Sequence, residues 1–114
     1  MSAPSAAIVA SELPNDKTLK NAARIAIEQD KPIMLDYYND TRDGKAFLGE
    51  DSATKEKMLV RSAEEYTSVI QKIFKVEFEL PGGKAGFDFI VITENSIYII
   101  DGTTKKKTIT APSA

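Results

Sequence analysis

The sequence contains no cysteine, no histidine and no tryptophan. Without cysteine there is no disulfide framework and no thiolate, and without histidine there is no imidazole metal ligand and no histidine general base. These absences exclude most zinc sites and the serine–histidine and cysteine–histidine classes of hydrolase. We therefore expect a protein that is not an enzyme and that uses no metal, no cofactor and no small-molecule substrate.

A large excess of charge is also lacking, because 15 basic residues stand against 17 acidic ones and the formal net charge is -2. Nucleic acid attracts surfaces rich in Lys and Arg, so we do not expect it as a partner. No apolar run approaches the roughly 18 residues that a membrane-spanning helix needs. The N-terminus lacks the basic start and long apolar stretch of a signal peptide. We expect no membrane span and a reducing, non-secretory compartment.

What is present is ordinary globular composition, with 42% hydrophobic and 28% charged residues in 114 positions. This predicts one small domain. Both ends of the chain are poor in large side chains, so we predict an N-terminal arm over 1–14, a domain over 15–101 and a C-terminal tail over 102–114. In the arm, Ile8 and Val9 are candidate contacts with a neighbouring protein, because such segments can order on binding.

The residues after Pro14 predict a helix that ends before Pro32, because the residue preceding a proline avoids the helical region. Asn15 or Asp16 can cap its start. Its apolar residues fall at helical spacing on one narrow, alanine-rich face, which suits close packing against a sheet or another chain. We predict that this face comprises Leu19, Ala23, Ala26 and Ile27.

Beyond Pro32 the apolar residues change from helical spacing to alternation, which is typical of strands. The alternation is clearest over 70–80, where Lys72 and Ile73 break it and indicate a bulge or a covered far face. Residues 39–44 have the composition of a turn. The predicted strands are 33–38, 45–49, 57–61, 70–80, 87–93 and 97–100.

The last two of these strands are apolar on both faces, which a half-exposed sheet would not tolerate. We therefore predict a mainly β fold with one N-terminal α-helix, arranged as a small SH3-like β-barrel or roll with flexible tails at both ends. A split sheet with the helix lying across it is the alternative.

Two groups of residues are candidates for contact with a partner. Tyr37 and Tyr38 can line a peptide groove on a small barrel, with core or interface packing as the alternative. Lys105, Lys106 and Lys107 form a basic run that can meet an acidic neighbour, with a solvated tail as the alternative.

Three segments carry a resemblance to a known group of proteins: KPIMLDYY at 31–38, EYTSVIQKIFK at 65–75 and TENSIYI at 93–99. They resemble small proteins of the nucleocytoplasmic large DNA viruses, such as the chlorella viruses and mimivirus-like viruses. The resemblance covers roughly residues 31–101 and supplies no catalytic residue.

The resemblance implies a minor capsid or cement protein that bridges other capsid proteins, major or minor, through its β core and terminal arms. Such a protein would be found in the virion and, during assembly, in the host cytoplasm. A different hypothesis is a small adaptor that binds a peptide or protein in the infected cell through a strand edge or a tyrosine-lined groove. A third is nucleic-acid binding through the barrel and the lysine run.

Overall fold

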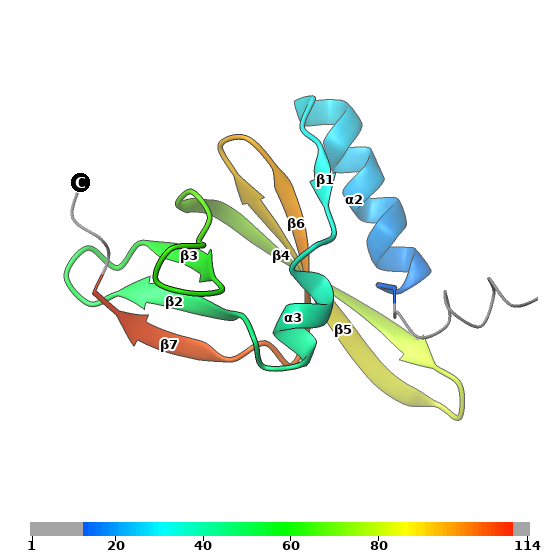
Figure 1. The fold of residues 1–114 in the computed structure, drawn as a ribbon. Helices are drawn as coiled ribbons and strands as arrows, with labels where there is room; N and C mark the ends of the chain where they lie inside the picture. The colour runs from blue at the N-terminus through cyan, green and yellow to red at the C-terminus, as the bar shows by residue number, and fades with distance from the viewer. Residues whose placement is uncertain (1–12, 111–114) are drawn as a thin grey trace, which may run out of the picture.

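The computed structural model describes residues 13–110 of the chain (Figure 1). Within them the strands form a four-stranded sheet in the order β1-β6-β5-β4 and a three-stranded sheet in the order β3-β2-β7. The prediction of a mainly β fold with an N-terminal helix is confirmed. The elements are α2 (Asp16–Gln29), β1 (Ile33–Met34), α3 (Tyr38–Arg42), β2 (Phe47–Asp51), β3 (Lys57–Val60), β4 (Ile70–Leu80), β5 (Lys84–Thr93), β6 (Ile97–Asp101) and β7 (Lys106–Ile109).

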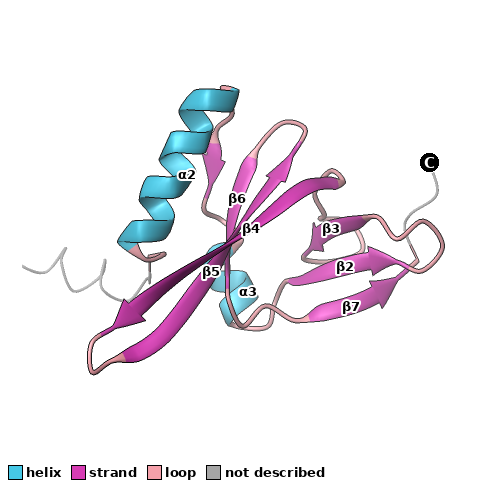
Figure 2. Cartoon of the chain, turned by 180° about the vertical axis from the view of Figure 1, so that it is seen from behind, coloured by secondary structure: helices cyan, strands magenta, loops and turns pink. Residues whose placement is uncertain are grey.

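The strands do not close into a barrel anywhere between residues 13 and 110. In the larger sheet β4, β5 and β6 are antiparallel and β1 runs parallel to β6, while in the smaller sheet β3 is antiparallel and β7 parallel to β2. Helix α2 lies across one face of the larger sheet, and the smaller sheet stands beside the other face (Figures 1 and 2). The arrangement is therefore closer to the split sheet with a helix across it than to the predicted barrel or roll.

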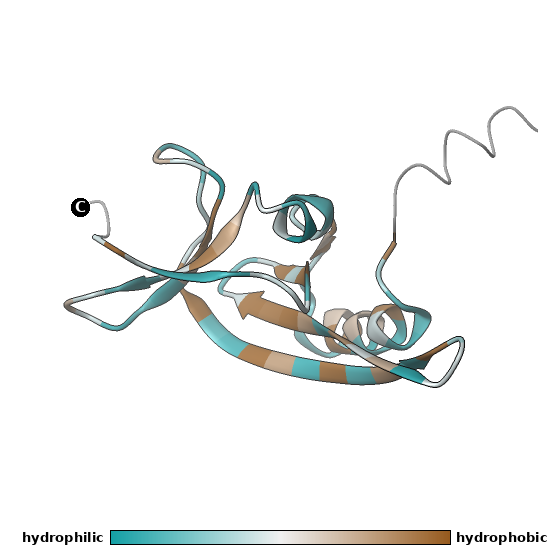
Figure 3. Ribbon diagram, turned by 90° about the horizontal axis from the view of Figure 1, so that it is seen from below, coloured by the Kyte–Doolittle hydropathy of each residue, from teal (hydrophilic) through white to brown (hydrophobic). Residues whose placement is uncertain are grey.

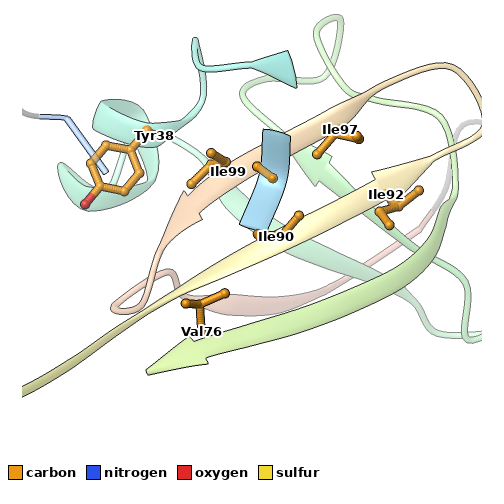
Figure 4. Close-up of a cluster of buried hydrophobic side chains, with 7 residues drawn as sticks. Tyr38, Val76, Ile90, Ile92, Ile97 and Ile99 are labelled. Atoms are coloured by element: carbon orange, nitrogen blue, oxygen red, sulfur yellow. The ribbon is translucent and has the colours of Figure 1, made fainter. Parts of the chain in front are cut away.

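Two buried clusters explain why β5 and β6 are apolar on both faces. Side chains that alternate along these strands point in turn to α2 and to the smaller sheet. Figure 4 shows the α2-side cluster, which comprises Ala22, Tyr38, Val76, Ile90, Ile92, Ile97 and Ile99. The cluster between the sheets comprises Tyr37, Ala46, Leu48, Leu59, Val91 and Ile100.

Helix α2 begins where the sequence predicts, because the Asn15 side chain accepts a hydrogen bond from the Lys17 N–H at 2.9 Å. It ends at a left-handed Asp30, before Pro32. Its predicted face is partly wrong, since Ile27 is 82% exposed and Ala23 is exposed as well. The helix instead buries Thr18 and Ala22, which are one turn apart, and packs Leu19, Ile25 and Ala26 beside them.

The segment after Pro32 differs from the predicted strand over 33–38. Strand β1 has only two residues, and the chain then turns into the short helix α3 where a turn was predicted over 39–44. Tyr38 and Thr41 are the buried residues of α3. The Thr41 hydroxyl oxygen accepts a hydrogen bond from the Asp101 N–H at 3.1 Å, so α3 packs against the end of β6.

The prediction of a long strand over 70–80 is confirmed, and so is the bulge, because the register of β4 against β5 shifts between Ile70 and Lys72. Strand β5 starts earlier than predicted, at Lys84, so the loop of this hairpin is short. Its Gly82 and Gly83 have positive φ angles of 87° and 79°, which glycine adopts at little steric cost.

The C-terminal segment differs from the predicted tail, because residues 106–109 form β7. The Leu48 N–H donates to the Lys105 carbonyl at 2.8 Å, and the Ser52 N–H donates to the Ile109 carbonyl at 3.1 Å. Ile109 packs over Gly49, where a Cβ would lie 2.8 Å from its Cδ1 atom. The predicted arm over 1–14 falls largely outside the described residues, as do positions 111–114.

Candidate functional site

The side of the smaller sheet that faces away from the core carries an open, mostly apolar hollow, here called the outer hollow. Tyr66 is 44% exposed at its rim, whereas Met58 and Val60 are buried in its floor. The surface gathers apolar groups from β2, β3, β7 and the segment after β3, which is the composition expected of a binding site. The outer hollow is lined by Phe47, Met58, Val60, Ser62, Ala63, Tyr66, Ile109 and Thr110.

Tyr66 is positioned because the chain after β3 folds back onto that strand. The Thr67 N–H donates to the Leu59 carbonyl at 2.9 Å, and the Leu59 N–H donates to the Thr67 hydroxyl oxygen at 3.0 Å. An isolated bridge pairs Tyr66 with Val60. These hydrogen bonds hold the rim of the outer hollow against β3, the strand that supplies its floor.

Strand β7 gives the outer hollow a basic border. It is the last strand of the smaller sheet, and two of the three predicted lysines, Lys106 and Lys107, belong to it, while Lys105 precedes it. The Lys107 ammonium lies 4.7 Å from the centre of the Phe47 ring, a cation–π contact at the edge of the hollow. Lys106 and Lys107 are therefore part of an ordered strand rather than a tail, and Lys107 lies beside the apolar surface.

Tyr37 does not line a groove, because it is 5% exposed in the cluster between the sheets. Its ring meets Tyr98 edge-to-face at 5.5 Å, and the Arg61 guanidinium lies 4.3 Å from its centre. Arg61 also donates to the Asp40 carboxylate at 2.7 Å. Burial raises the pKa of the Tyr37 hydroxyl. Tyr37 is therefore a core residue, as the alternative interpretation of the sequence expects.

Tyr38 is 7% exposed and lies on the opposite side of the larger sheet from Tyr37. Its hydroxyl donates to Asp88 at 3.4 Å, and the Thr18 hydroxyl donates to the same carboxyl group at 2.8 Å. A second hollow opens here, beside the loop end of the β4–β5 hairpin. It is lined by Leu13, Asn15, Tyr38, Phe78, Leu80, Ala85, Gly86, Phe87, Asp88, Asp101, Gly102 and Thr103.

Asp88 ties β5 to the start of α2. Its side chain is 1% exposed, and it also accepts a hydrogen bond from the Asn15 N–H at 3.3 Å. Burial raises the pKa of this carboxyl, while the hydrogen bonds from Thr18 and Asn15 oppose part of the rise and the facing Asp101 adds to it. All the hydrogen bonds described for this group lead to the protein, so we interpret Asp88 as a structural residue.

The raised pKa of Asp88 predicts a pH-dependent stability. The folded protein holds this proton more tightly than the unfolded chain does, so the stabilisation is complete below the unfolded pKa of about 3.9. It is lost as the pH rises from the unfolded pKa through the folded-state pKa. Between these two pKa values, we expect the free energy of unfolding of Asp88→Asn to rise relative to that of wild type. Urea denaturation at several pH values from about 4 to 8 measures this difference. Glu94→Gln, at an exposed turn, is the control, and a pH-independent difference for Asp88→Asn would contradict the assignment.

The predicted contact residues are thus not brought to one place. Lys107 adjoins the outer hollow, whereas Lys106 lines a separate hollow with Leu48 and Ile100. Tyr37 and Tyr38 lie in separate cores, and Ile8 and Val9 lie outside the described residues. Sequence reasoning missed the outer hollow, although one signal was present. Met58, Leu59 and Val60 are consecutive apolar residues, so β3 had to be apolar on both faces.

Comparisons with protein-family models, with curated proteins and with solved structures give no match for this chain. No helix among residues 13–110 is long and apolar enough to cross a membrane. Over the same residues, no three Asp or Glu side chains come together as a group that could hold a metal ion.

Proposed function

We propose that this chain is a non-enzymatic structural protein of a large DNA virus, a minor capsid or cement protein that bridges capsid components. The observation that carries the proposal is the outer hollow, an apolar surface with Tyr66 at its rim. Tyrosine contributes disproportionately to protein interfaces, because it buries a large rigid ring and keeps a polar tip. The viral origin and the capsid partner rest on the resemblance of residues 31–101.

Location tests this proposal directly. In purified particles of the virus that encodes the chain, mass spectrometry should find it in a fixed ratio to the major capsid protein. Chemical cross-linking should join residues around the outer hollow to a capsid protein. A trace amount, or complete absence from the particles, would contradict the capsid role.

We expect Tyr66→Ser to lower incorporation into particles by at least about tenfold, because a tyrosine that is buried on binding and acts as a hot spot contributes about 2 kcal/mol or more. Its side chain is 44% exposed, so folding should be largely retained. The matched control is Ile27→Ser, which removes an apolar side chain that is 82% exposed on α2. If both variants were incorporated equally, the outer hollow would not be part of the interface with the capsid.

A second candidate function is a small adaptor that binds a peptide or protein in the infected cell, because β7 is an edge strand of the smaller sheet. It carries Lys106 and Lys107 and has no strand on its far side within residues 13–110. An extended peptide can add to such an edge through main-chain hydrogen bonds, and lysines favour an acidic one. This role predicts a protein that stays in the infected cell and binds acidic peptides with an affinity that falls as salt rises.

A further inference from the structure

Among residues 13–110, the longest strand at the end of a sheet is β4, and its free side is open. This strand has 11 residues, and within residues 13–110 it pairs only with β5. Every second residue of an antiparallel edge strand points its N–H and C=O away from the sheet, so β4 offers a row of main-chain groups to another strand. In Figure 3 it is the long strand along the lower edge of the molecule, with hydrophobic and hydrophilic residues alternating along it.

The side chains of β4 differ on its two faces. On the face towards α2, Val76 joins the buried cluster, while Phe74 next to it remains 39% exposed. On the other face, the Lys75 ammonium lies 3.5 Å from the Glu77 carboxylate, with side-chain exposures of 49% and 75%. The strand thus has an exposed aromatic ring on one face, and on the other face Lys75 next to Glu77, with Glu79 beyond them.

We propose that a second copy of this chain pairs with this edge, β4 against β4, antiparallel about a two-fold axis at Val76. Lys75 then lies opposite Glu77 of the second copy, and the same pair forms again across the axis. On the α2 face, Phe74 lies opposite Phe78 of the second copy. Opposite charges and aromatic pairs at facing positions both stabilise antiparallel strands.

The charge pattern selects this register over its two neighbours. If the two-fold axis lay at Lys75, Lys75 would lie directly opposite Lys75 of the second copy. If the axis lay at Glu77, Glu77 would lie directly opposite Glu77 of the second copy. Like charges directly opposite one another destabilise a sheet. An axis at Val76 avoids both contacts and closes the assembly as a symmetric dimer, in which the same patch serves both copies.

Pairing would also cover the open groove between α2 and β4. In the single chain this groove leaves Phe74 exposed beside Ile25, and the Lys17 ammonium donates to the Glu77 carbonyl at 2.8 Å. The two four-stranded sheets would become one continuous sheet, with both copies of α2 on the same face. The inference is independent of the proposed function, because the outer hollow belongs to the other sheet.

Complementary charge reversal tests the dimer with the full chain. Sedimentation velocity over a range of concentrations should show wild type dimerising, and Lys75→Glu or Glu77→Lys alone should weaken dimerisation by at least about tenfold. In Lys75→Glu, positions 75 and 77 are both acidic, and in Glu77→Lys they are both basic. An equimolar mixture should therefore form a heterodimer with about the wild-type affinity.

Lys20→Glu, a charge reversal at an exposed position of α2, is the matched control and should dimerise like wild type. The proposal is overturned if wild type stays monomeric, if neither variant weakens the dimer, or if the mixture does not recover it. Circular dichroism of each variant separates a lost interface from a lost fold.

A cysteine placed at the axis tests the register without changing charge, because the chain has no cysteine of its own. Directly opposed residues on antiparallel strands have Cα atoms about 4.5–5.5 Å apart, which suits a disulfide. Mild oxidation should therefore cross-link Val76→Cys as a dimer on a non-reducing gel. Glu79→Cys, which faces Ile73 of the second copy, should not cross-link, and equal cross-linking of both would contradict the register.

Discussion

Leu59→Ala is expected to lower the free energy of unfolding by about 2–5 kcal/mol, the range for truncating a buried leucine. Leu59 is 0% exposed and lies between the two sheets, against Leu48, Val91 and Ile100. Because these neighbours belong to hydrogen-bonded strands, they cannot collapse into the space that the lost atoms leave. A small domain has only about 5–15 kcal/mol of stability in total, so the variant can approach unfolding at room temperature.

Urea denaturation followed by circular dichroism measures this loss, and amide exchange locates it. Protection should fall first in β2, β3 and β7, because the cluster around Leu59 holds the smaller sheet to the larger one. Ile27→Ala, at an 82% exposed position, is the control and should change stability by no more than about 0.5 kcal/mol. If the two variants lost the same stability, the two sheets would not pack as described.

Gly102→Ala is expected to destabilise the fold by about 1–3 kcal/mol through overpacking. Gly102 follows the end of β6, where the chain crosses close to β5. A Cβ there would overlap the main-chain oxygen of Phe87 and lie 2.8 Å from Cδ2 of its ring. A ring can rotate away, but the main-chain oxygen cannot move without disturbing β5.

Gly82→Ala separates this steric effect from the general effect of losing a glycine. Gly82 has a φ of 87° and no atom within 4 Å of its virtual Cβ, so its substitution costs only the backbone strain of about 1 kcal/mol. Thermal or urea unfolding of both variants compares the two. A loss at Gly102 no greater than the loss at Gly82 would show that residues 87 and 102 do not approach as closely as described.

The elements that the sequence predicts well are those whose signals are local. The cap at Asn15 and the stop before Pro32 define α2, and the alternation over 70–80 defines β4 together with its bulge. The sequence predicts the buried face of α2 less well, because alanines and isoleucines are spread around the helix. Tertiary packing against β5 and β6, which local spacing does not contain, buries Thr18 and leaves Ile27 in solvent.

The candidate surfaces depend on contacts between distant parts of the chain, so the sequence predicts them poorly. The outer hollow requires Ile109 of β7 to reach β2, which lies far earlier in the chain. The basic run before Ile109 looks like a solvated tail when it is considered alone. Tyr37 and Tyr38 are neighbours in sequence, yet the start of α3 sends them into opposite cores.

The position of β7 has a consequence for the order in which the protein forms during its synthesis. The last strand of the four-stranded sheet ends at Asp101, whereas the smaller sheet needs Lys106–Ile109, which follow it in the chain. Pairing β7 with β2 also closes a long stretch of chain, which makes it a slow, non-local step. The nascent chain can therefore assemble the helix-covered sheet first, and the outer hollow is complete only after β7 has been synthesised.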